Sequence, residues 1–138
     1  SSLTEKGFEV VAREDTNGTF DSALEAAKKI LNEQPDITAI MCGNDQMAVA
    51  AKTALNLAGN DQTVVYSIDG SPDIKKELKK ADGQIAGTVA QSPVNIGKKA
   101  VDIALDILEG KDFEKETSVD VFMINKENVE MYGADGWQ

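Results

Sequence analysis

Short β-prone runs alternate along this chain with segments whose apolar residues recur at helical spacing. Strands are predicted at residues 8–12, 37–42, 63–68, 84–90 and 119–124, and helices at 20–33, 45–58, 72–80 and 93–109. Strands separated by helices of this length pair in parallel through right-handed crossovers, so the order predicts a doubly wound α/β lobe with a mainly parallel sheet. The runs 37–42 and 63–68 are nearly continuously apolar, which is typical of strands buried on both faces.

Residues that start and stop helices support these boundaries. Ser71 and Ser92 are each followed by a proline, which combines a capping side chain with the residue best suited to the first helical position. Ser22 and Glu25 fit a capping box near the start of the first long helix. Pro35 ends that helix, because proline cannot continue it. We find no internal repeat or long linker, so residues 1–138 are expected to form one lobe.

Composition excludes several classes of function. The 138 residues contain 24 acidic and 14 basic side chains, giving a net charge of -10, which disfavours nucleic acid and anionic membranes as partners. The chain has no histidine and only one cysteine, Cys42, so histidine-based catalysis, Cys/His zinc sites and an internal disulfide are excluded. Neither a metal nor a cofactor is predicted, and no apolar run is long enough to cross a membrane.

Polar side chains follow three successive predicted strands. Asn44 and Asp45 follow the run 37–42, Asp69 follows 63–68, and Gln91 follows 84–90. Ligands of such sheets bind outside the carboxyl ends of the strands. A carboxylate accepts bonds from two hydroxyls, and each amide offers a donor and an acceptor, so this set suits a neutral polyhydroxylated ligand. These segments contain no basic residue, which disfavours an anionic ligand.

Each of these residues also has a structural explanation. Asn44 suits a helix N-cap, and Asp45 in the following turn complements the helix dipole. Gln91 can satisfy backbone groups where the chain crosses over. Asp69 is the strongest functional candidate, because Ser71 is already available to cap the next helix. Cys42 is expected to be a small buried hydrophobe.

Enzymatic patterns are lacking. Asp69 at a strand end suggests a phosphate-accepting receiver domain, whose sites also use an acidic pair after the first strand and a lysine. Here the first strand leads into Arg13-Glu14-Asp15, and no lysine follows strand 84–90. The glycines form no phosphate-binding loop or dinucleotide fingerprint, and no Gly-x-Ser-x-Gly elbow occurs. We therefore expect a binding protein rather than an enzyme, with a receiver-like signalling domain as the weakest alternative.

Three motifs resemble those of periplasmic sugar-binding proteins of the ribose/galactose type. Residues 35–50 resemble the segment that carries Asn-Asp-x-Met-Ala in that family, and 65–70 resemble its strand ending in Asp-Gly. Residues 85–93 resemble its Thr-Val-Ala-Gln-x-Pro segment, and 96–100 the helix that follows it. The motifs occur in the family's order and spacing and cover nearly the whole chain.

The resemblance implies a periplasmic-binding-protein type I fold, in which two α/β lobes close over a sugar and present it to a membrane ABC permease. Residues 1–138 would be the carboxyl-terminal lobe, a fragment without the amino-terminal lobe and without the second lobe's opening strand and helix. Residues 92–112 would cross the hinge and supply a helix that packs on the other lobe. An export signal upstream would place the protein in the periplasm, or outside the cell on a lipid anchor.

The same resemblance assigns the ligand contacts. Asn44, Asp69 and Gln91 would bind a neutral monosaccharide (a pentose or hexose) or a related polyol. Asp45 and Phe20 are secondary candidates. Phe20 stands near the position of the family's aromatic-Asp-Arg cluster, whose arginine is missing from residues 17–22.

Two questions stay open at the level of sequence. The effector-sensing domain of a sugar-responsive transcriptional repressor shares the fold, and upstream sequence would distinguish it from a transport protein. The apolar stripe of helix 93–109, with Ile96, Ala100, Ile103 and Ile107, needs a partner. Without a second lobe, we expect it to repack on its own sheet or to associate with a second copy.

Overall fold

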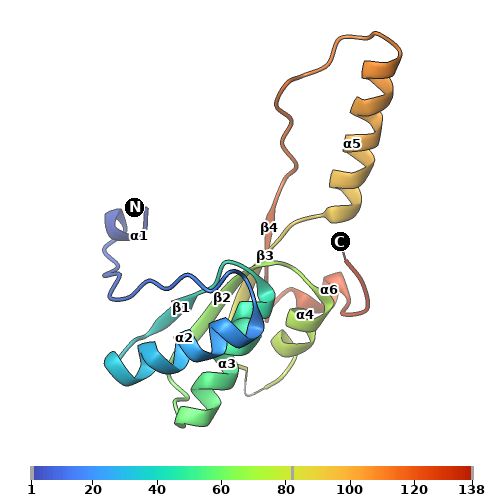
Figure 1. Cartoon of the computed structure of the whole chain (residues 1–138). Coiled ribbons are helices and arrows are strands. Elements are labelled where there is room, and N and C mark those ends of the chain that lie inside the picture. Colours follow the sequence, from blue (N-terminus) through green and yellow to red (C-terminus); the bar gives the residue numbers. More distant parts are fainter. Residues whose placement is uncertain (1, 82, 138) are drawn as a thin grey trace.

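Four strands form one sheet in the order β1-β2-β3-β4 (Figure 1). The structure, a computed structural model, describes residues 2–81 and 83–137. β1 and β2 pair in parallel, as do β2 and β3, whereas β3 and β4 are antiparallel. This mainly parallel α/β sheet confirms the predicted fold class. The elements are α1 (Ser2–Glu5), α2 (Phe20–Glu33), β1 (Ala39–Met41), α3 (Asp45–Ala58), β2 (Val64–Asp69), α4 (Pro72–Leu78), β3 (Ile85–Ala90), α5 (Pro93–Leu108), β4 (Phe122–Asn125) and α6 (Val129–Tyr132).

The hydrophobic core lies between the sheet and the helices α3 and α4. α3 packs on β2, α4 packs on β3, and α2 lies along the outer side of α3. Each fully buried Leu or Ile side chain there contributes about 1.5–3 kcal/mol relative to exposure. The largest fully buried apolar side chains of this core include Leu55 from α3, Ile74 and Leu78 from α4, Val65 from β2, Ile85 from β3 and Ile124 from β4.

Two of the three helix caps predicted at serines form. The hydroxyls of Ser71 and Ser92 accept bonds from the backbone N–H groups of Ile74 and Asn95. The capping box at Ser22 is wrong, because α2 begins earlier, at Phe20, with Thr19 as its N-cap residue.

The predicted first strand is also wrong. Residues 8–12 form no regular element in the part of the chain that the structure describes, and Phe8 is 61% exposed. A β-prone run becomes a strand only when a neighbouring strand supplies hydrogen-bond partners. β1 is the edge strand of the described sheet, and residues 8–12 do not pair with it or with any other described strand.

The sheet is covered on one face rather than two. Along β2, Val65 and Ser67 are buried beneath the helices, while Val64 and Ile68 on the opposite face are exposed. Met41 at the end of β1 is 62% exposed. The sequence prediction that 37–42 and 63–68 are buried on both faces is therefore wrong for the chain as it stands.

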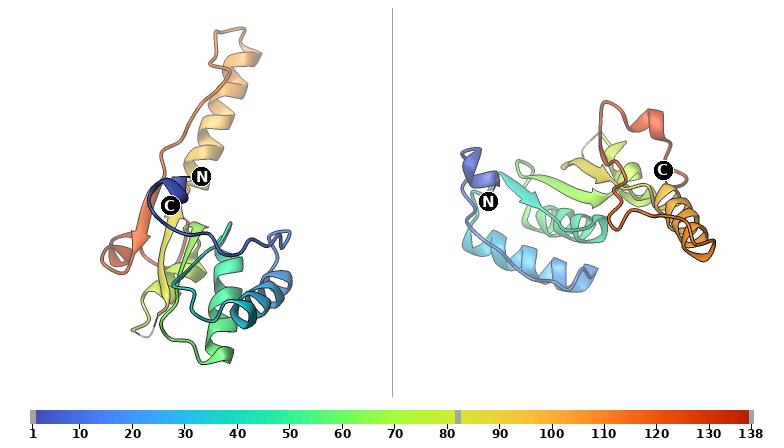
Figure 2. Two further views of the ribbon diagram at one scale, coloured as in Figure 1. Left: turned by 90° about the vertical axis from the view of Figure 1, so that its left-hand side faces the viewer. Right: turned by 90° about the horizontal axis from the view of Figure 1, so that it is seen from above.

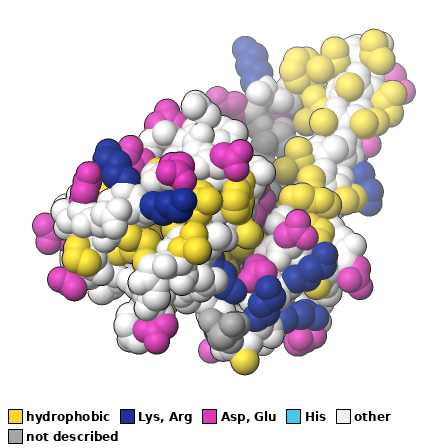
Figure 3. Space-filling model, turned by 60° about the horizontal axis from the view of Figure 1, so that its bottom comes forward, with side chains coloured by type: hydrophobic (Ala, Val, Ile, Leu, Met, Phe, Trp, Pro, Cys, Tyr) yellow, Lys and Arg dark blue, Asp and Glu magenta, His cyan; other side chains and the backbone are white. Residues whose placement is uncertain are grey.

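α5 stands away from the sheet (Figures 1 and 2). None of its residues, all of which the structure describes, is buried. The chain returns from Glu109 to Val121 without regular structure, and we call residues 93–121 the arm. Hydrophobic side chains gather on the projecting arm (Figure 3). The expectation that α5 repacks on its own sheet is wrong. Within the described residues, no helix combines the length and hydropathy needed to cross a membrane.

Candidate ligand-binding site

The carboxyl ends of β2 and β3 bring two of the predicted ligand residues into contact. Asp69 is the last residue of β2, and Gln91 follows β3 directly. The Gln91 side-chain amide donates to Asp69 Oδ1 at 3.2 Å, and the Gln91 backbone N–H donates to the Asp69 carbonyl at 3.1 Å. Parallel pairing in register explains this contact, because it aligns the ends of adjacent strands.

The turn after β2 is conformationally strained. Asp69 has φ 129° and Gly70 has φ 76°, so two successive residues occupy positive φ. A non-glycine residue in this region costs about 1–3 kcal/mol, and such residues cluster at functional sites. Only glycine fits at position 70, because a Cβ there would lie 2.5 Å from the Cβ of Ala90. This turn lies at the carboxyl end of β2, where Asp69 lines a hollow described below.

The Asp69 carboxylate is partly desolvated. Burial, together with the neighbouring negative charge of Asp45, raises the pKa of Asp69. Hydrogen bonds from the Asp45 backbone N–H and from Gln91 act in the opposite direction. The hydrogen bonds that the protein gives to the Asp69 carboxylate therefore do not fully compensate for its loss of water. Hydroxyl donors of a ligand would supply the missing hydrogen bonds.

Asp45 has a structural role. Its side chain is buried, and its Oδ1 accepts bonds from the hydroxyls of Ser67 at 2.5 Å and Thr88 at 2.8 Å. Its Oδ2 accepts from the backbone N–H of Ser71 at 2.6 Å. These bonds tie the start of α3 to β2, β3 and the start of α4. Protein donors occupy both oxygens, which favours helix support, the structural explanation weighed from sequence, over ligand contact.

Asn44 is held at the start of α3. Its Oδ1 accepts the backbone N–H of Met47 at 2.8 Å, which confirms the predicted cap, and its Nδ2 donates to the Gly18 carbonyl at 3.0 Å. The next residue, Asp45, donates its backbone N–H toward Asp69 Oδ2 at 3.5 Å. Asn44 thus lies beside the Asp69–Gln91 pair but is not among the described residues that line the hollows there.

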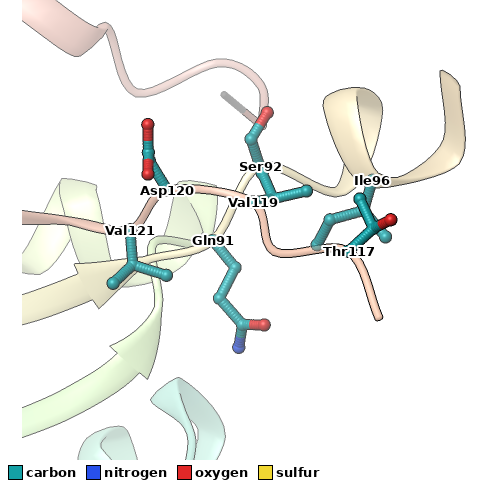
Figure 4. A pocket seen from close by; sticks show the side chains of 7 residues that line it. All are labelled: Gln91, Ser92, Ile96, Thr117, Val119, Asp120 and Val121. Atoms are coloured by element: carbon teal, nitrogen blue, oxygen red, sulfur yellow. The ribbon is translucent and has the colours of Figure 1, made fainter. Parts of the chain in front are cut away.

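Two hollows adjoin Gln91. The smaller, of about 290 Å³, lies where the two segments that connect the arm to the sheet run together (Figure 4). The Gln91 side chain points away from those of Ser92 and Asp120 in this view (Figure 4). The larger hollow, of about 560 Å³, is lined by two polar and four apolar residues: Asp69, Gln91, Pro93, Val94, Ile96 and Trp137.

Trp137 is the aromatic lining residue of the larger hollow, and the sequence did not predict it as a ligand contact. It lies in the carboxyl-terminal tail, about 45 residues along the chain from Gln91, and no strand end or spacing pattern marks it. Phe20, the secondary aromatic candidate, is half-buried at the first position of α2 and is not among the described lining residues.

The site offers hydrogen-bonding groups beside apolar surface. In residues 2–81 and 83–137, we find no cluster of three or more histidine, cysteine, aspartate or glutamate residues able to hold a metal ion. Cys42 is buried, as predicted, and burial together with the charge of Asp45 raises the pKa of its thiol to about 11. It is therefore protonated at neutral pH and a poor nucleophile.

Comparison with known proteins identifies the family. Residues 1–112 match the family model described as a periplasmic binding protein domain. The chain belongs to this family. A ribose import binding protein of Salmonella typhimurium is 34% identical over 120 residues, which cover 87% of this chain and 40% of that protein. The D-allose-binding periplasmic protein of Escherichia coli is 33% identical over 100 residues, covering 72% of this chain and 32% of that protein.

Solved periplasmic binding proteins share the architecture. A solute-binding protein from Bacillus halodurans with bound myo-inositol superposes with a TM-score of 0.86 at 29% identity, covering 96% of this chain and 46% of that one. One from Actinobacillus succinogenes with bound D-allose gives 0.84 at 29% identity, covering 90% and 44%. This chain spans about 40% of the length of the ribose import binding protein it matches.

Proposed function

We propose that this chain is the carboxyl-terminal lobe of a two-lobe protein that binds a neutral monosaccharide or polyol for a membrane ABC importer. The lobes close over the ligand, and closure converts binding into a change of shape that the permease recognises. The role is binding without catalysis, and it is carried out in the periplasm or, on a lipid anchor, outside the cell.

The contact between Asp69 and Gln91 at the mouth of one hollow is the observation that carries this proposal. Asp69 accepts hydroxyl hydrogens of the sugar, and Gln91 donates to and accepts from neighbouring hydroxyls. Asn44 completes the set through its second amide hydrogen. The absence of a basic residue from these strand ends favours an uncharged sugar over a sugar phosphate or acid.

Exposed apolar surface supports the two-lobe arrangement. The free face of the sheet, with Val64 and Ile68, and the stripe of α5, with Val101 and Leu105, are exposed in the described residues. Soluble proteins rarely leave contiguous apolar patches uncovered. Residues 92–112 cross the hinge, and α5 packs on the amino-terminal lobe.

Transport is favoured over transcriptional regulation. Among the relatives, the proteins from Salmonella typhimurium and Escherichia coli are named as import-binding and periplasmic proteins. The structural neighbours from Bacillus halodurans and Actinobacillus succinogenes are ABC transporter components. A repressor's effector domain would share the fold, but these matches support the importer.

Substituting the two aspartates tests the proposal. In the full-length protein, we expect Asp69→Asn to weaken binding about 10- to 100-fold, because a charge-assisted acceptor is lost. Calorimetry with D-ribose, D-allose and myo-inositol measures this. Because the pKa of Asp69 is higher in the folded protein than in the unfolded chain, the charged form of Asp69 destabilises the folded protein at neutral pH. We therefore expect Asp69→Asn, which removes this charge, to leave the melting temperature unchanged or to raise it slightly.

Asp45→Asn is the matched control for this experiment. It replaces a buried acceptor of three hydrogen bonds, so the melting temperature should fall. Sugar affinity that is unaltered by Asp69→Asn would remove the Asp69–Gln91 pair from the site.

A further inference from the structure

The carboxyl-terminal tail, residues 133–137, returns to the candidate site. Trp137 lines the larger hollow together with Asp69 and Gln91, and it is the only tryptophan of the chain. The two polar groups and the indole ring are therefore exposed to the same space. The ring is 49% exposed, so it is not a core side chain.

A buried lysine fixes the tail. Lys75 in α4 has no exposed surface, and its ammonium group donates to the carbonyl of Gly136 at 2.5 Å. Burial lowers the pKa of Lys75, while the nearby charge of Asp135 opposes this shift. Burying an ammonium group is costly unless hydrogen bonds compensate it. The Gly136 carbonyl supplies such a hydrogen bond to Lys75, and Gly136 directly precedes Trp137. Lys75 therefore constrains the position of the tail.

We propose that Trp137 is the apolar platform of the sugar site and that Lys75 positions it. A sugar has hydroxyl groups around its rim and C–H groups on its ring faces. Asp69 and Gln91 bind hydroxyls, and the indole packs against a ring face, where a large rigid aromatic surface adds affinity at a low cost in conformational entropy. This inference rests on the proposed function and adds a ligand contact from a segment that the strand-end motifs do not include.

Trp137 variants of the full-length protein test this directly. With D-ribose, D-allose and myo-inositol in calorimetry, we expect Trp137→Ala to weaken binding about tenfold and Trp137→Phe to weaken it less. Phe113→Ala is the matched control, since Phe113 is an aromatic of similar exposure, 50%, in the arm segment. We expect the sugar to shift fluorescence emission in the wild type and the shift to be reduced in Trp137→Phe.

Lys75→Met tests the positioning role, with the exposed neighbour Lys76→Met as its control. We expect Lys75→Met to change the emission of Trp137 without sugar and to weaken binding, whereas Lys76→Met does neither. A protein that binds sugar equally well with Trp137→Ala, or whose sugar-induced emission shift is as large in Trp137→Phe as in the wild type, overturns the platform and leaves the proposed function standing. A wild type that binds none of the three sugars overturns both.

Discussion

Helices α3 and α5 are built alike but are packed differently. Both follow a strand end, both begin at a residue whose side chain caps the helix, and their lengths are 14 and 16 residues. α3 buries seven residues against the sheet and its neighbouring helices, whereas none of the described residues of α5 is buried. An amphipathic stripe thus indicates that a helix has a face to bury but does not identify the surface that covers it.

The contrast separates the chain into two regions. We call the sheet with α2, α3, α4 and α6 the body; it has a continuous core and polar side chains engaged across its elements. The arm has apolar side chains exposed to solvent, Val101 at 60% and Leu108 at 83%. Folding stability of the isolated chain should therefore reside in the body, and the arm should contribute through association.

Truncating one leucine in each region gives the largest expected difference. Leu55 of α3 is fully buried and Leu105 of α5 is 51% exposed. We expect Leu55→Ala to lower the free energy of unfolding by about 2–5 kcal/mol and Leu105→Ala to change it by less than about 0.5 kcal/mol. Urea unfolding of the isolated 138-residue chain, at a concentration where it is monomeric and followed by circular dichroism, measures both.

Ile74→Val serves as a milder probe of the core if Leu55→Ala fails to fold, with an expected loss of about 0.5–1.5 kcal/mol. Similar losses for Leu55→Ala and Leu105→Ala would mean that α5 is packed in solution, and the division into body and arm would be wrong.

The sequence predicted the body better than the arm for a physical reason. The mainly parallel sheet, most helix bounds and the positions of Asp69 and Gln91 at the ends of successive strands follow from local patterns, and the structure agrees with them. The hydrogen bond between Asp69 and Gln91 was not itself predicted. The hydrogen bonds that the buried Asp45 carboxylate accepts from Ser67 and Thr88 were not predicted. Its partners Ser67 and Thr88 stand at inward-facing positions of their strands, which is a signal that alternation alone could have supplied.

The errors share one cause. Residues 8–12 and the free face of the sheet have apolar patterns that require neighbours, and the described residues include none to cover them. Trp137 was missed because its position depends on a contact between Lys75 and Gly136, 61 residues apart in sequence. Local sequence patterns indicate that a segment has an apolar face to bury, whereas contacts between distant segments determine whether that face is covered and where a residue such as Trp137 lies.

The apolar face of α5 should drive self-association of the isolated chain, an effect of intermediate size. Each Leu or Val buried between copies contributes up to about 1.5–3 kcal/mol. We expect concentration-dependent dimers by light scattering, and Val101→Glu with Leu105→Glu should make the chain monomeric. Lys98→Glu, on the same helix, is the control for the charge change. A monomeric wild type at all concentrations would contradict this prediction.

The smallest expected effect compares ion pairs of the two regions. In the body, Glu77 of α4 accepts from Lys52 of α3 at 2.7 Å, with side-chain exposures of 18% and 10%. Burial alone would raise the pKa of Glu77, but the hydrogen bonds and charges of Lys52 and Lys80 lower it below its usual 4.5. In the arm, Asp106 pairs with Lys111 at 3.2 Å and is 42% exposed.

Because the folded pKa of Glu77 lies below the unfolded one, its ionised form stabilises the body above about pH 4.5, and this contribution is lost as the pH falls through the folded pKa. We expect Glu77→Gln to lower stability by about 1 kcal/mol at neutral pH and to flatten the acid limb of the stability curve. Asp106→Asn should leave the curve unchanged, since exposed pairs are screened. Melting temperatures of the three proteins from about pH 3 to 7 provide the comparison. Identical curves for Glu77→Gln and the wild type would show that the Lys52–Glu77 pair between α3 and α4 does not stabilise the body.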